Sequence, residues 1–137
     1  MSARVHWDGL DELKADLRNL PRALAGEGAV IVYAAADRAA GAIVAGYPRR
    51  TGDLRKGVSV KRENSSFGAA AIVRNRAPHA HLFELGTEVR HTAIGANRGR
   101  MPPGHVFIPI VQRERRAMYE RLKELLRRQG LTVTGDA

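Results

Sequence analysis

The chain contains no cysteine and few aromatic residues. Aromatic side chains make up 5% of the 137 residues, and tryptophan occurs once. Without cysteine the chain has no disulfide and no thiolate nucleophile, and it lacks the ligand that most structural zinc sites use. The sequence also shows no helix-turn-helix, ribbon or aromatic stacking signature of a sequence-specific nucleic-acid reader.

Long apolar runs and recognised catalytic motifs are also missing. Asp37 and Arg38 interrupt the most apolar stretch, so no uninterrupted run approaches the roughly 18 residues of a membrane span. The N-terminus lacks the apolar core of a secretory signal. No Gly-x-Ser-x-Gly elbow, phosphate-binding glycine loop or nuclease carboxylate cluster occurs. We therefore expect no membrane partner, no enzyme activity, no cofactor and no metal.

Positive charge is the strongest bulk property that the chain does have. Its formal net charge is +9 and its isoelectric point is about 11.0. A basic surface attracts nucleic acid, an anionic membrane or an acidic protein. Arginine carries most of the excess, and it suits phosphate contacts and interface ion pairs. The sign of the charge does not choose among these partners.

The hydrophobic pattern predicts one α+β domain over residues 1–137. Leucines at three- and four-residue steps predict a short helix, and a long alanine-rich helix follows over 22–46. Pro21 would either end the first helix or open the second. Alternation from Leu54 to Arg62 predicts a strand, and 68–74 predicts a second strand that pairs with it. A short helix or turn over 78–85 should end at Gly86. An amphipathic helix over 112–129 should end at Gly130.

Residues 88–105 form the least regular part of this pattern. The segment contains three glycines, two prolines and only one acid, so we expect a long basic loop. Its Arg90, Arg98 and Arg100 are candidates for contact with DNA phosphates or with an acidic neighbouring subunit. A third strand or extended lead-in is expected over 106–111, and residues 131–137 should form a flexible tail.

Three short motifs stand in order between these elements. The first is PRRTGDL at 48–54, the second HAHLFELGT at 79–87, and the third PPGHVFIP at 102–109. Together with the long helix before them and the amphipathic helix after them, they resemble the head–tail joining proteins of tailed bacteriophages. This family is also described as neck, tail-completion or minor tail proteins. Seven residues carry the motifs and would organise their turns: Thr51, Gly52, Glu84, Gly86, Thr87, Phe107 and Pro109.

The resemblance implies a fold in which a small antiparallel sheet packs against the two long helices. It also implies a structural virion protein at the neck or tail top, assembled in the host cytoplasm as a cyclic ring around the DNA channel. Head-closure or adaptor proteins and tail-terminator or tail-tube proteins would then be its partners, with non-specific contact to channel DNA. Arg113 and Arg116 on the last helix join the three loop arginines as interface or channel candidates.

Two alternatives remain open from the sequence. A tail-terminator or minor tail protein would share the same fold and composition. A small basic nucleic-acid-binding protein or ribonuclease would use His79, His81 and Glu84 as working groups. The same histidines could bind a metal only with a third ligand folded back onto them, and polar residues leading into a packed turn are the simpler interpretation.

Overall fold

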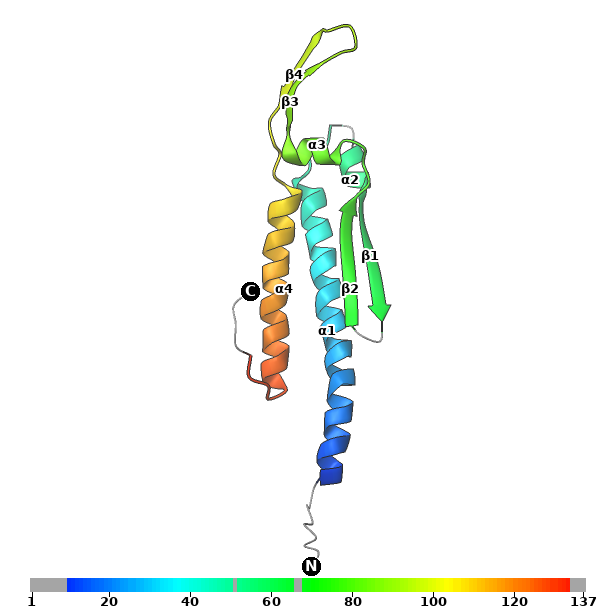
Figure 1. The fold of residues 1–137 in the computed structure, drawn as a ribbon, viewed down its shortest axis with the longest axis vertical. Coiled ribbons are helices and arrows are strands. Elements are labelled where there is room, and N and C mark those ends of the chain that lie inside the picture. Colours follow the sequence, from blue (N-terminus) through cyan, green and yellow to red (C-terminus); the bar gives the residue numbers. More distant parts are fainter. Residues whose placement is uncertain (1–9, 51, 66–67, 134–137) are drawn as a thin grey trace, which may run out of the picture.

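The computed structural model describes residues 10–50, 52–65 and 68–133, and only the backbone of residues 10–20, 64 and 65 (Figure 1). It confirms the α+β class, with four helices and two separate antiparallel hairpins in the described chain. In chain order the elements are α1 Leu10–Gly46, α2 Asp53–Lys56, β1 Val58–Ser65, β2 Gly68–Asn75, α3 Ala80–Leu85, β3 Thr87–His91, β4 Asn97–Met101 and α4 Phe107–Arg128.

The helix α1 is the scaffold of the fold. It runs along the long axis of the molecule, with α4 packed along one side and the β1–β2 hairpin along the other (Figure 1). The buried apolar side chains are few and mostly small: Ala35, Ala36, Ala39, Ile43, Tyr47 and Leu125. Alanines on α1 let both neighbours approach its backbone closely, so the core is a thin layer on either side of one helix.

The prediction that Pro21 separates two helices is wrong. The helix α1 continues through Pro21 for 37 residues. A proline inside a helix removes one backbone hydrogen bond and crowds the turn before it, which bends or breaks many helices. Here the remaining hydrogen bonds on both sides keep one helix.

Residues Pro21–Gly46 of α1 are long and apolar enough to cross a membrane by length and composition alone, with a mean hydropathy of 1.4. The expectation that no stretch reaches this size therefore does not hold. In the fold, the two charged residues near its centre, Asp37 and Arg38, pair with residues of the same chain. Arg62 on β1 pairs with Asp37, and Glu114 on α4 lies 3.3 Å from Arg38. These ion pairs connect the stretch to β1 and α4.

The predicted hairpin is confirmed, with a later start. β1 and β2 pair in antiparallel register from Val58 opposite Asn75 to Ser65 opposite Gly68. Leu54 does not belong to the strand, because Gly52 has a φ of 78° and opens the single helical turn α2 instead. Burial alternates along β2, so one face of the hairpin lies on α1 and the other is exposed.

The predicted loop over 88–105 is also wrong. Most of it is a second hairpin, β3–β4, which projects from the end of the molecule beyond α3 (Figure 1). Bulges interrupt its register between Thr87 and His91, which explains why its strands show no clean alternation. We call residues Thr87–Met101 the arm.

The last helix begins earlier than the sequence indicates. Residues 106–111 are not a strand, since α4 starts at Phe107 and runs to Arg128. Pro109 is tolerated because it lies in the first turn, where backbone N–H groups have no partner within the helix. The predicted apolar stripe lies between α4 and α1, with Leu125 2% exposed, and Gly130 follows the helix with a φ of 77°.

Candidate functional site

The three sequence motifs meet at the C-terminal end of α1. The first motif continues from α1 into α2, the second forms α3, and the third leads into α4, so all three lie at the base of the arm (Figure 1). We call this region the motif junction. The side chains that hold it together are Tyr47, Arg55, Asn75, Phe83, Glu84 and Thr87.

Glu84 is the centre of the motif junction. It is the one charged residue among the described side chains that is buried, at 6% exposure. One carboxylate oxygen, Oε2, accepts the backbone N–H groups of Val106 and Phe107, each at 2.9 Å. The other oxygen, Oε1, accepts that of Ile108, also at 2.9 Å. A residue 22 to 24 positions earlier in the chain therefore caps the N-terminus of α4.

This geometry explains both the position and the ionisation of Glu84. Val106 precedes α4 and makes no side-chain cap of its own, so the first N–H groups of the helix need an acceptor. Burial by itself raises the pKa of the Glu84 carboxyl group. The three backbone hydrogen bonds and the nearby His105 outweigh that effect and hold the pKa below its ordinary value. The carboxylate is thus charged and also favoured by the helix dipole.

A second set of contacts ties α1 to α2 and β2. The Arg55 guanidinium donates to the carbonyl of Tyr47 through Nε at 3.0 Å and through Nη2 at 2.7 Å. The Asn75 amide donates to the carbonyl of Leu54 at 3.0 Å. The Tyr47 ring is 2% exposed and meets the Phe83 ring edge-on, with centroids 5.5 Å apart. Burial, together with the nearby Glu84 carboxylate, raises the pKa of the Tyr47 hydroxyl despite a hydrogen bond to Asn75 that lowers it.

Gly86 and Thr87 connect the motif junction to the arm. Gly86 has a φ of 76°, and a Cβ at that position would lie 2.7 Å from the carbonyl oxygen of Met101. Only glycine therefore fits both the backbone conformation and the space. The Thr87 hydroxyl accepts the backbone N–H of Met101 at 3.1 Å, which joins the two ends of the arm.

The remaining motif residues occupy supporting positions. Gly52 precedes α2 in the left-handed region, and Phe107 contributes one of the N–H groups that Glu84 accepts. Pro109 is exposed in the first turn of α4. Thr51 lies outside the described residues.

The predicted arginines fall into two separate groups. Arg90, Arg98 and Arg100 are exposed on the arm. Arg113 and Arg116 are exposed on α4, beside a shallow depression that Pro109, Gln112 and Glu120 also line. The structure therefore does not bring the five arginines together into one basic site.

His79 and His81 lie in a different environment from Glu84. Both histidines are exposed at the start of α3, whereas both oxygens of Glu84 are occupied by backbone donors. In the described part of the chain, no group of three or more histidines and acids is placed to hold a metal ion.

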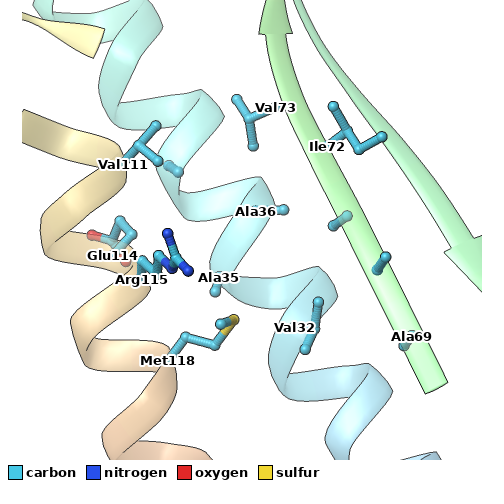
Figure 2. A pocket seen from close by; sticks show the side chains of 13 residues that line it. Val32, Ala35, Ala36, Ala69, Ile72, Val73, Val111, Glu114, Arg115 and Met118 are labelled. Carbon is cyan, nitrogen blue, oxygen red and sulfur yellow. The ribbon is translucent and has the colours of Figure 1, made fainter. Parts of the chain in front are cut away.

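An apolar groove lies on α1, between α4 and the edge of β2 (Figure 2). Its volume is about 490 Å³. The floor consists of Val32, Ala35, Ala36 and Ala39, and the walls include Met118 from α4 and Ile72 from β2. Both inward- and outward-facing residues of β2 line the groove, so it follows the side of β2 that has no strand partner in the described chain.

Sequence reasoning missed Tyr47, Arg55 and Asn75. The roles of Tyr47 and Asn75 depend on contacts with residues of other elements. Arg55 contacts the Tyr47 carbonyl, but it lies where the alternating pattern predicted a polar residue of a strand. The only available signal was their position next to the first motif and at the end of β2.

Comparison with known proteins identifies the family. The family model described as "Bacteriophage HK97-gp10, putative tail-component" matches residues 11–86, which covers α1, the β1–β2 hairpin and the second motif as far as Gly86. No curated protein and no solved structure matches the chain. Because the matched segment exceeds half of the 137 residues, the chain belongs to the HK97-gp10-like family of bacteriophage tail components.

Proposed function

We propose that this tail component assembles into a ring at the interface between the phage head and tail, where it joins the two and surrounds the DNA channel. Its role is structural and involves no chemical turnover. The observation that carries the proposal is the apolar surface that a single copy leaves exposed to solvent. Among the described side chains only six apolar residues are buried, whereas seven large apolar residues are at least 41% exposed.

Three of these exposed side chains lie on different parts of the subunit. Ile72 is 44% exposed at the groove, Val30 is 67% exposed on α1, and Leu85 is 64% exposed at the motif junction. An apolar groove with an exposed aliphatic side chain on its wall is typical of a surface that another chain covers. The groove and the opposite side of the subunit differ from each other, so copies that met through them would form head-to-tail contacts, which close into a ring when the rotation permits.

The motif junction supports a structural role over a catalytic one. Its buried carboxylate joins α3 to α4, and its buried tyrosine joins α1 to α3. The ribonuclease alternative needs Glu84 as a free acid or base, and its two oxygens already accept three N–H groups. The rigid junction instead holds the arm and the long helices in a set arrangement, as a building block requires.

The positive charge suits a ring through which DNA passes. Arg113 and Arg116 face solvent on α4, and backbone electrostatics favour phosphate without reading sequence. Head-closure or adaptor proteins on one side and tail-terminator or tail-tube proteins on the other would be the neighbours. A minor tail or tail-terminator position is the second candidate, because the family is described as a tail component.

Electron microscopy of the phage that encodes this chain tests the proposal. A stop codon early in the gene should yield DNA-filled heads lying apart from complete tails, and the wild-type gene supplied in trans should restore joined virions. Tails of irregular length would instead support the tail-terminator position. Joined, infectious virions without the protein would refute a structural role, and loss of a nuclease activity in His81→Ala would then support the ribonuclease alternative.

A further inference from the structure

We propose that the arm docks into an apolar pocket rimmed by carboxylates on a different protein of the virion, and that it is not the contact between copies in the ring. This inference extends the proposed function, on which it rests, by assigning a partner surface. Its basis is the projection of the arm from the body, together with its exposed aliphatic side chains and unpaired positive charge.

The arm is built for contact outside its own chain. Its strands β3 and β4 pack mainly against each other, while the hairpin extends away from α1 and α4 (Figure 1). A two-stranded hairpin without a packing partner is marginally stable in water. An arm that projects in this way gains a packed face only when another molecule covers it.

The tip of the arm is an ordered turn. The Thr92 N–H donates to the carbonyl of Ala96 at 2.8 Å, and the Gly95 N–H donates to the carbonyl of Thr92 at 2.9 Å. The Thr92 hydroxyl also accepts the Ala96 N–H at 3.0 Å. This closed turn presents Ile94 with 92% of its surface exposed, and Val89 on β3 is 51% exposed. Aliphatic side chains at the tip fit an apolar pocket. They would add little affinity for the phosphate backbone of DNA.

The charges on the arm are uncompensated. Arg90 lies opposite Gly99 in the hairpin, and Arg98 and Arg100 flank that glycine, so three guanidinium groups come from one short stretch. Glu88 is the only acid of the arm. No carboxylate in the described part of the chain forms an ion pair with these arginines, and guanidinium groups bind carboxylates with two parallel hydrogen bonds.

A second copy of this chain is poorly suited to supply those carboxylates. Six acids on the described body pair with cations of the same chain, and Asp53 makes an interaction of its own. The six are Glu27, Asp37, Glu63, Glu114, Glu120 and Glu124. Glu84 is buried and bound to backbone N–H groups. A net charge of +9 on each copy further opposes docking of the basic arm on a second copy of the chain. A partner with an acidic surface satisfies the arginines and the aliphatic tip together.

Site-specific photocrosslinking in the assembled phage tests this inference. A photoreactive phenylalanine analogue replaces Ile94 in the plasmid-borne gene that complements the stop-codon phage, and purified virions are irradiated and analysed by mass spectrometry. We expect a crosslink to one virion protein of different sequence, at an apolar position with carboxylates around it. The same analogue at Leu131, which is 41% exposed at the other end of α4, is the control and should not give that product.

Every other result contradicts the inference. A crosslink to a second copy, including its acidic segment from Asp8 to Asp16, would make the arm a ring contact, and a crosslink to DNA would make it a channel contact. No crosslink at Ile94 would show that nothing covers the tip. Absence of the protein from purified virions would instead refute the proposed function itself, so the two failures are distinguishable.

Charge reversal provides a second test. The triple change of Arg90, Arg98 and Arg100 to glutamate should leave the oligomer of the purified protein unchanged, because the arm is not the ring contact. It should lower the titre of complemented phage by at least about a hundredfold, because like charges would face each other across the contact. The triple change to lysine keeps the positive charge, so it should lower the titre much less than the change to glutamate. Full titre with the glutamate triple variant would overturn the inference.

Discussion

The sharpest structural prediction concerns Glu84. Replacing it by glutamine removes the negative charge and leaves a single carbonyl oxygen in place of two acceptors. That oxygen can still accept the N–H groups of Val106 and Phe107, but the amide nitrogen then faces the N–H of Ile108, donor against donor. A hydrogen bond to a charged group contributes about 1.5–3 kcal/mol, and a charge at a helix N-terminus contributes about 0.3–1 kcal/mol. We therefore expect Glu84→Gln to lower the free energy of unfolding by about 2–4 kcal/mol.

This loss is a large part of the roughly 5–15 kcal/mol that stabilises a typical domain. It should appear as a lower midpoint in urea titrations followed by far-UV circular dichroism, with an unchanged slope, at several protein concentrations so that assembly is controlled. Glu120→Gln is the matched control, because Glu120 lies on α4 and is exposed with one ion pair to Lys123. The free energy of unfolding of the control should stay within about 0.5 kcal/mol of the wild-type value. If Glu84→Gln were equally stable, the carboxylate would not be the cap of α4.

Three further predictions follow from the same structure. The stabilisation by Glu84 should be complete above its ordinary pKa of 4.5 and decline as pH falls below that value, so the difference between wild type and Glu84→Gln in urea titrations should shrink in acid. Gly86→Ala should destabilise the chain more than Gly95→Ala in thermal unfolding; both have positive φ, but only at Gly86 would a Cβ collide with another backbone atom, and equal losses would contradict this view of Gly86. Ile72→Asp should abolish the oligomer in native mass spectrometry without changing the circular dichroism spectrum, whereas Ile72→Val should preserve it; an intact oligomer with Ile72→Asp would show that the groove is not covered by a second copy.

Local patterns predicted the elements that depend on neighbouring residues. The apolar period of α4 and the alternation of the β1–β2 hairpin appear where the sequence places them, within a few residues. The predicted boundaries failed where a distant group decides the conformation. α4 begins at Phe107 because Glu84 caps it, and no local pattern contains that information. The arm was missed because its bulges break the alternation that marks a strand.

The sequence by itself determined the fold class, the order of the three motifs and, through them, the family. These features depend on residue type and spacing along the chain. Only the tertiary structure decided what the motifs do: it placed the Glu84 carboxylate on the N-terminus of α4, set Arg55 on the carbonyl of Tyr47, and turned a basic segment into an arm with Ile94 at its tip. Hydrogen bonding and burial depend on distances between residues far apart in the sequence, and folding alone sets those distances.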